Sequence, residues 1–339
     1  IDQLVQQYSP NSLLAPALGA FDVVATRNWL NDLGIPTFVG TSRRVFPQPE
    51  IKPAQVLQKW KDRLLDQGVT FHLHHRFIGF SETFLPILEH LGHQSTVEAE
   101  AYIFALGAAS WPKTGSNGHW VDAFRQLPVP ICTFQPSNCG VLVNWDKNLL
   151  APHFGKPLKN IAIQCEDRVV KGEAILSNYG LEGNAIYPLI PSIRTQLANT
   201  YQAQLTIDFK PNNQWAQLLG KYKAERGNTK TYARQLNLNK VELALLKAQT
   251  TQDEFQDPKQ FISKVKALTI SVNGLRPIEE AISCAGGVDQ VALNTDFSLK
   301  DFPQIYTIGE MVDWDAPTGG FLLQACFSMG YFVGQNLLK

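Results

Sequence analysis

Near the C-terminus, a carboxylate follows what is expected to be a buried strand. Residues 305–308 form a short apolar run, and Gly309 and Glu310 come directly after it. A glutamate there can accept hydrogen bonds from ligand hydroxyl groups, and bonds to a charged acceptor are stronger than neutral ones. Ligands of open α/β sheets bind where parallel strands end. Glu310 is therefore a candidate ligand contact, and a solvated carboxylate at the sheet edge is the alternative.

A glycine pair opens the next segment. Gly319 and Gly320 precede residues 321–338, an apolar stretch that is expected to be a helix. The first N–H groups of a helix lack internal partners and carry partial positive charge, so they suit an anionic or electron-rich ligand. A Gly-rich turn without a ligand explains the spacing equally well. Polar side chains within the stretch favour a buried helix over a membrane span: Gln324, Gln335 and Asn336.

Two groups of residues raise the question of a metal. Asp313 and Asp315 follow Glu310, but three acids without a histidine partner are a weak metal pattern. His72 and His74 would share a face of a strand, but no cysteine or acid in register completes a ligand set. Polar positions on an edge strand are the favoured interpretation of these histidines. We therefore predict no metal site.

Four segments, spread over nearly the whole chain, carry a resemblance to a known family. In chain order they are RVFP at 44–47, GAASWPKTGS at 107–116, AGGV at 285–288 and GEMVDWDAPTGGFLLQA at 309–325. Together they closely resemble bacterial BaiN/YhiN-type flavoproteins, usually labelled NAD(P)/FAD-dependent oxidoreductases. The resemblance implies an α/β fold with an FAD/NAD(P)-binding, Rossmann-like domain of the glutathione-reductase-like kind. It also implies an inserted α+β domain of barrel-like strands plus helices.

The resemblance implies non-covalently bound FAD near these segments. The helix that begins after Gly320 would point at the part of the ring that becomes negative on reduction, and would thereby raise its reduction potential. Leu106 departs from a family threonine, so a hydroxyl contact is lost there, while backbone approach at Gly107 remains. The cofactor-binding residues predicted on this basis are Gly107, Ala108, Ser110, Trp111, Gly309, Glu310, Asp313, Thr318, Gly319, Gly320, Phe321 and Leu322.

Arg43 and Arg44 come directly before Val45, Phe46 and Pro47. Arginine presents a rigid fork of donors that suits phosphate or carboxylate groups, so these residues could bind a pyrophosphate or an acidic substrate. Solvated arginines on an exposed loop are the equally weighted alternative.

Composition limits the class of protein. The 339 residues suggest two domains, or one domain with a large insertion, and 44% hydrophobic residues against 18% charged provide a substantial core. Thirty basic residues cancel thirty acidic ones, so we expect a small-molecule substrate and neither nucleic acid nor membrane as partner. Five widely spaced cysteines without a C-x-x-C pair indicate free thiols and a cytoplasmic location.

Local patterns predict several elements of the first part of the chain. Helices are expected over 21–34 and from Pro53 to the residues before Gly68, because proline suits a first helical turn and glycine follows helix ends. Val69, Phe71 and Leu73 alternate as in a strand. With further strand-like runs at 84–88 and 97–105, they fit a small antiparallel crossover. The continuous apolar run 101–106 predicts a return to a parallel sheet.

The pattern of predicted secondary structure changes after Pro136. Short strand-like pieces at 139–143, 161–165, 174–176 and 205–209 are followed by polar helices near 215–225 and 240–250. Strands and then helices, without a βαβ rhythm, predict an inserted α+β domain. We assign it to residues 137–280, and the discontinuous FAD-binding Rossmann-like domain to residues 1–136 and 281–339.

The first residues contain no G-x-G-x-x-G fingerprint before a helix. The resembling flavoproteins begin with that fingerprint, in a βαβ unit of roughly 30 residues or more. We therefore expect the Rossmann-like domain formed by residues 1–136 and 281–339 to lack this N-terminal βαβ unit. Binding of FAD by this stretch alone is expected to be poor, because the glycine loop for the cofactor's adenosine half is missing.

Two functions of different class follow. The preferred one is a flavoprotein oxidoreductase in which FAD takes hydride from NAD(P)H and passes it to a small organic acceptor; family analogy favours an activated C=C bond. No catalytic acid or base can be named from the sequence, because no hydrolase, metalloprotease or P-loop motif is present. The alternative is a degenerate flavoprotein fragment that acts as a non-catalytic binding or interaction module.

Overall fold

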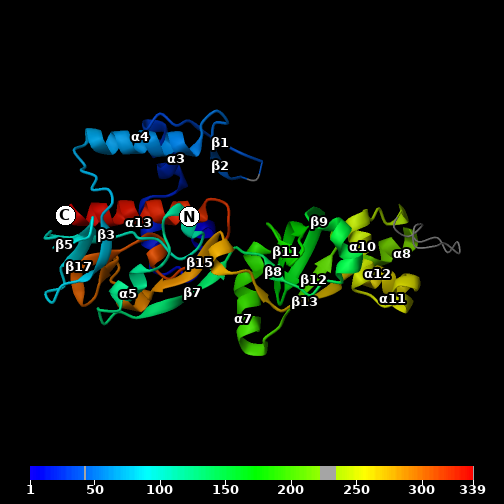
Figure 1. Cartoon of the computed structure of the whole chain (residues 1–339). Coiled ribbons are helices and arrows are strands. Elements are labelled where there is room, and N and C mark those ends of the chain that lie inside the picture. Colours follow the sequence, from blue (N-terminus) through cyan, green and yellow to red (C-terminus); the bar gives the residue numbers. More distant parts are fainter. Residues whose placement is uncertain (42, 222–233, 339) are drawn as a thin grey trace. The chain divides into compact units, whose positions relative to one another are not determined.

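The computed structural model describes residues 1–41, 43–221 and 234–338, which divide into two compact units (Figure 1). The first consists of Ile1–Gln135 and Cys284–Lys339, and the second of Pro136–Ser283. The inserted domain expected at 137–280 thus corresponds to a unit of 136–283. The roles expected of the two units, cofactor-binding domain and inserted domain, stay predictions.

A parallel strand pair lies at the centre of the first unit. Strand β6 (Tyr102–Phe104) pairs in parallel with β17 (Phe302–Thr307), and β16 (Ser298–Leu299) continues the sheet on the far side of β17. Ile305 lies opposite Tyr102, and Thr307 opposite Phe104. The prediction of a parallel strand within 101–106 and of a strand ending near 308 is confirmed. Because the two strands run in the same direction, the segments that follow them begin at the same edge.

A three-stranded antiparallel sheet covers this pair through aromatic side chains. It consists of β3 (Arg76–Phe80), β4 (Pro86–His90) and β5 (His93–Thr96). Phe77 of β3 contacts Phe104 of β6 with ring centroids 4.8 Å apart. Phe124, on the short helix α5 (Trp120–Phe124), is fully buried and lies 5.0 Å from the ring of Phe104. This cluster fixes the crossover sheet and α5 against the central strands.

The strand predicted at Val69, Phe71 and Leu73 is wrong. These residues form no strand, and their side chains are 42%, 43% and 68% exposed. The alternating pattern is real, but a strand also needs a partner that supplies its ladder of hydrogen bonds. The edge of β4 is instead occupied by Arg76–Phe80, which begins three residues after Leu73.

The helices of the first unit follow the predicted signals. Helix α4 (Pro53–Asp66) begins at its proline, and the side chain of Gln55 accepts a hydrogen bond of 2.8 Å from the N–H of Lys52. The C-terminal helix α13 (Phe321–Leu337) begins after Gly320 and buries Ala325, Met329 and Val333. The remaining elements are α1 (Asp2–Val5), α2 (Leu14–Ala20), α3 (Val23–Asp32), the hairpin of β1 (Thr37–Val39) and β2 (Val45–Pro47), and the pair β7 (Ile131–Ser137) and β15 (Ser283–Val288).

The second unit is an antiparallel sheet with helices. Its seven strands lie in the order β13-β12-β9-β10-β11-β8-β14, and every neighbouring pair is antiparallel. The strands are β8 (Val141–Leu142), β9 (Lys156–Cys165), β10 (Arg168–Leu176), β11 (Gly180–Glu182), β12 (Ala203–Asp208), β13 (Leu268–Val272) and β14 (Gly274–Leu275). The helices are α6 (Lys147–Leu150), α7 (Ile190–Thr200), α8 (Trp215–Lys221), α10 (Lys240–Ala248), α11 (Gln252–Gln256) and α12 (Pro258–Lys266).

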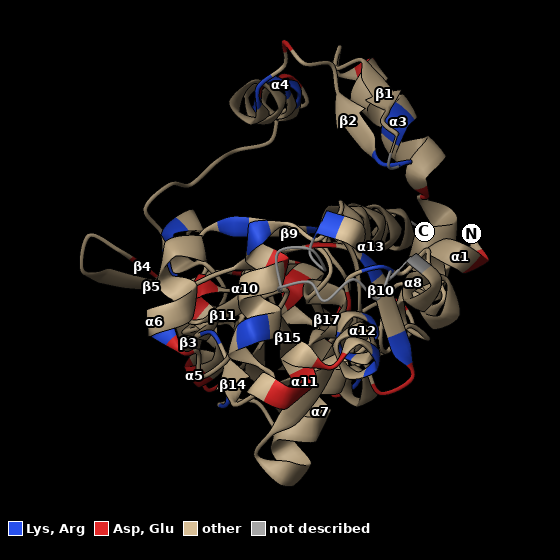
Figure 2. Ribbon diagram, turned by 90° about the vertical axis from the view of Figure 1, so that its right-hand side faces the viewer, with Lys and Arg blue, Asp and Glu red and all other residues tan. Residues whose placement is uncertain are grey.

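This arrangement agrees with the α+β texture of the sequence. The helix expected over 240–250 is α10, and the helix expected over 215–225 begins as α8, while its predicted end lies outside the described residues. Basic and acidic residues are interspersed along the ribbon, as the balanced composition suggests (Figure 2). Within the described ranges, no helix has both the length and the apolar character needed to cross a bilayer.

The aromatic cluster yields a stability prediction. Replacing Phe124 by alanine should lower the free energy of unfolding by about 3–5 kcal/mol, because a fully buried ring is lost between β3, β6 and α5. Phe71→Ala, at a half-exposed ring in the segment wrongly predicted as a strand, should cost far less. Urea unfolding monitored by circular dichroism compares the two; equal losses would show that the cluster does not stabilise the unit.

Candidate functional site

The ends of β6 and β17 bring two predicted segments together. Gly107 follows β6 and Gly309 follows β17, and the register places the last residues of these strands opposite one another. Both glycines have left-handed backbone angles, with φ of 75° and 71°. Side chains rarely adopt this conformation, so the turns out of both strands favour glycine. The structure therefore assembles at one sheet edge two segments that lie 202 residues apart in sequence.

The loop after β6 is held by hydrogen bonds on its carbonyl side. The indole N–H of Trp120 donates to the carbonyl of Gly107 at 2.8 Å. The hydroxyl of Ser116 donates to the carbonyl of Leu106 at 2.7 Å and also to that of Ala108. Ala108 is buried, whereas the Trp111 ring is 47% exposed. Of the predicted residues in this loop, Trp111 has the side chain most accessible to a ligand.

The N–H side of the same loop contacts a cysteine that sequence reasoning did not include. The N–H of Ala109 donates to the sulfur of Cys284 at 3.3 Å. Ser110 lies beside the same sulfur and acts to lower the pKa of the thiol, against the larger effect of burial. The only sequence signal for Cys284 is its place directly before the segment AGGV.

The N-terminus of α13 is open. Gly320 is its N-cap with φ of 94°. Among the described residues, no side chain caps the helix, and a Cβ on Gly320 would meet no atom within 4 Å. The first hydrogen bond into the helix from this turn joins the N–H of Gln324 to the carbonyl of Gly320 at 3.0 Å. The N–H groups of Phe321 and Leu322 precede it, and a helix leaves such groups without internal partners. The turn at Gly320 therefore combines open space with backbone N–H groups that can donate hydrogen bonds to a ligand.

Arg44 reaches the same turn. Its Nη2 donates to the carbonyl of Thr318 at 3.1 Å, and its guanidinium occupies the space that a side chain on Gly319 would need. Phe321 is bound from the other side, because its carbonyl accepts a hydrogen bond of 2.8 Å from the hydroxyl of Tyr8. The turn of Thr318, Gly319, Gly320 and Phe321 thus lies beside an arginine that the sequence marked only as a candidate for anion binding.

Glu310 directly follows Gly309 and is half-buried. Burial raises the pKa of its carboxyl group above the ordinary value. Burial also raises the pKa of the Cys326 thiol to about 12, and the nearby charge of Glu310 adds to this shift. Glu310 acts in the same direction on the pKa of Cys284, where burial is again the largest cause. Two thiols therefore flank this carboxyl group, and no pattern in the sequence indicates their proximity.

Asp313 has a different environment from the other predicted residues. One of its carboxylate oxygens accepts a hydrogen bond of 2.8 Å from the N–H of Gly286, and its own N–H donates to Val288 at 2.9 Å. The aspartate thus ties the loop after β17 to β15. Cys132 lies against the same carboxylate and against Asp289, whose oxygen is 3.7 Å from its sulfur. Within the described residues, no group of three or more His, Cys, Asp or Glu side chains is arranged to hold a metal ion.

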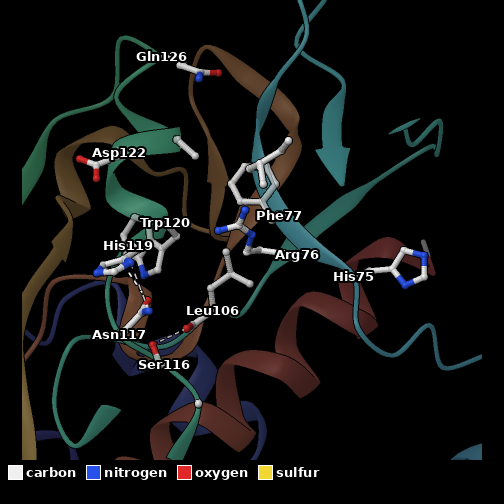
Figure 3. A pocket seen from close by; sticks show the side chains of 13 residues that line it. His75, Arg76, Phe77, Leu106, Ser116, Asn117, His119, Trp120, Asp122 and Gln126 are labelled. Atoms are coloured by element: carbon white, nitrogen blue, oxygen red, sulfur yellow. Dashed lines mark hydrogen bonds between the residues drawn. The ribbon is translucent and has the colours of Figure 1, made fainter. Parts of the chain in front are cut away.

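A cavity of about 670 Å³ adjoins the loop after β6 (Figure 3). Arg76 and Phe77 of β3 line it together with Trp120 of α5, and Leu106 and Ser116 form the side next to Gly107. Aromatic rings beside a few polar groups are typical of small-molecule pockets. Sequence reasoning missed most of its lining, which also includes His75, Asn117, His119, Asp122 and Gln126.

Three observations test whether an anionic or electron-rich group such as a flavin fits these residues. The N-terminus of α13 has open space beside Gly320, and no side chain of the described residues caps it. The space beside Gly107 is instead filled by the side chain of Ser116, so the glycine of this loop serves its turn. The hydroxyl of Thr307, fully buried at the end of β17, has no hydrogen-bond partner among the described residues. The residues present fit such a group.

Comparison with known proteins gives one match over almost the whole chain. The sequence model of a family described as "HI0933-like protein Rossmann domain" matches residues 1–336. Among solved structures, 3-ketosteroid Δ1-dehydrogenase from Sterolibacterium denitrificans, in complex with 1,4-androstadiene-3,17-dione, is 12% identical with a TM-score of 0.39. The match covers 84% of this chain and 62% of that enzyme, so the chain spans less than two thirds of its length. Likeness at this level assigns no residue and no substrate.

The raised pKa of Glu310 predicts a pH dependence of stability. Between the ordinary carboxyl pKa and the raised pKa, the folded chain holds a proton that the unfolded chain releases, so the free energy of unfolding should fall as pH rises through this range. Glu310→Gln should remove this decline, and Glu100→Gln, at an exposed glutamate, should leave it unchanged. Urea unfolding at a series of pH values decides; identical profiles for wild type and Glu310→Gln would contradict the assignment.

Proposed function

The chain belongs to the HI0933-like family of Rossmann-domain proteins, and from this premise we propose that it is a BaiN/YhiN-type oxidoreductase that uses non-covalent FAD. We further propose that NAD(P)H is the electron donor and that a small organic molecule, with an activated C=C bond as the favoured class, is the acceptor. A cytoplasmic location belongs to the same proposal.

One observation carries the proposal. Two strand ends, each followed by a left-handed glycine, and the uncapped N-terminus of α13 lie in the same unit, and Glu310 directly follows Gly309. Hydrogen-bond donors and open space at a helix N-terminus, with a half-buried carboxyl group after a strand, are what a dinucleotide cofactor needs in a Rossmann-like fold. This arrangement supports the functional proposal as well as the family assignment.

The residues that would hold FAD divide into two groups. Glu310 and the first turn of α13, with Gly319, Gly320 and Leu322, would contact the flavin half. Gly107 and its neighbours Ala108 and Ser110 would lie along the phosphates, next to the cavity formed with β3 and α5. That cavity would take a further part of the cofactor.

FAD would supply hydride acceptance and donation, which no side chain of this chain can perform. The chain's own contribution is binding and electrostatics. The N–H groups at the start of α13 would stabilise negative charge placed beside them, and this requires no acidic or basic side chain. Glu310 would fix orientation by hydrogen bonding. No residue is assigned as a catalytic acid or base.

The direct test uses the intact gene product. We expect it to purify with oxidised-flavin absorbance and to lose that absorbance when NADH or NADPH is added without oxygen. The rates with the two nucleotides, measured by stopped flow, identify the donor. A protein that binds FAD but is reduced by neither nucleotide would contradict the proposed donor, and a protein that binds no FAD would favour the alternative of a non-catalytic binding module.

The open turn at Gly320 yields a prediction about the flavin. Gly320→Leu should weaken FAD binding and lower the reduction potential by roughly 5–20 mV, because a bulky side chain in the open space would keep the ring from the helix N-terminus. Gly320→Asn is the matched control, since asparagine tolerates a left-handed backbone. Spectroscopic redox titration compares both with wild type; an unchanged potential and affinity in the leucine variant would show that the turn is only structural.

A further inference from the structure

We propose that Cys284 is a positioning residue that holds the loop 107–111 at the end of β6. The loop's consequence for cofactor affinity rests on the function proposed above, whereas its anchoring by Cys284 does not. Cys284 is the second residue of β15 and is only 5% exposed. It thus lies on a strand other than the two that carry the candidate site.

The sulfur of Cys284 receives a hydrogen bond from the loop. The N–H of Ala109 donates to it at 3.3 Å, and Ser110 lies beside the same sulfur. A sulfur is a weak acceptor. The contact nevertheless joins the backbone of the loop to a buried residue of β15.

The loop is therefore fixed on both sides. Trp120 and Ser116 hold the carbonyl groups of Gly107 and Ala108, and Cys284 holds the N–H group of Ala109. The carbonyl contacts come from residues that follow the loop closely in sequence. Cys284 comes from a segment 175 positions after Ala109, so it determines where the loop lies relative to the rest of the unit.

Cys284 also connects the loop to Glu310. The charge of Glu310 acts on the thiols of both Cys284 and Cys326, so the carboxyl group lies near the sulfur that binds the loop. Cys284 thereby joins the ends of β6 and β17, the two features proposed to contact the cofactor. Loss of its sulfur should shift the loop relative to Glu310 while the core around Phe124 remains intact.

The experiment separates the acceptor from the volume of the side chain. Cys284→Val keeps an apolar side chain of similar size but removes the acceptor, and Cys284→Ser keeps an acceptor. In the chain without FAD, amide hydrogen exchange of Ala109 should be roughly threefold to tenfold faster in the valine variant, and closer to wild type in the serine variant. Cys165→Val, at a fully buried cysteine of the other unit, is the control and should leave this amide unchanged.

Exchange that is faster in the serine variant than in the valine variant would overturn the proposal, because volume rather than the acceptor would then hold the loop. Unchanged exchange in both variants would also overturn it. A second measurement, FAD titration of the intact gene product, should give a Kd several-fold higher for Cys284→Val than for Cys284→Ser. If wild type binds no FAD, the proposed function fails, and hydrogen exchange still decides the role of Cys284.

Discussion

The parallel pairing of β6 with β17 is the constraint on which the candidate site depends. Its register sets Thr307 opposite Phe104, so the chain leaves both strands at one edge, through Gly107 and Gly309. Any other register would move Glu310 away from the loop that follows β6. The aromatic contacts of Phe104 with Phe77 and Phe124 stabilise this pairing from one face. The candidate site is therefore built from segments that are distant in sequence, because the pairing of the two strands brings those segments together.

The two halves of the site differ in how their polar groups are satisfied. In the loop after β6, carbonyl and N–H groups already bind Trp120, Ser116 and Cys284. At the start of α13 no side chain caps the helix, and space is open beside Gly320. Backbone N–H groups that already bind protein atoms fix the shape of a binding surface. Backbone N–H groups without such partners can attract a ligand by hydrogen bonding to it. We therefore expect α13 to provide most of the electrostatic attraction for a bound group, and the loop to provide the surface against which it lies.

Local signals in the sequence are sufficient to predict individual helices and strands, but not to predict which elements pack against one another. Pro53 and Gly320 mark helix starts because backbone geometry alone determines those positions. The alternation at Val69, Phe71 and Leu73 fails as a signal because a strand requires a partner, and β4 pairs with Arg76–Phe80 instead. The family resemblance groups Gly107, Glu310 and Gly319 from their motifs alone. The resemblance does not identify Cys284 or the contact of Arg44 with Thr318, and it does not identify the cavity residues on β3 and α5. Those contacts depend on tertiary packing between distant segments.

Burial of Glu310 has consequences beyond its own pKa. The raised pKa shifts the balance of this carboxyl group towards its protonated form relative to an exposed glutamate. The protonated form can donate one hydrogen bond as well as accept them, whereas the charged form only accepts. Donor-rich surroundings, such as the ribityl hydroxyl groups of a flavin, would shift the balance back towards the charged form. Cys284 and Cys326 oppose this ionisation less than two acids would, because raised thiol pKa values keep both sulfurs neutral. The carboxyl group of Glu310 thus has two neutral, polarisable thiols as neighbours, and these hinder a change of its charge less than charged neighbours would.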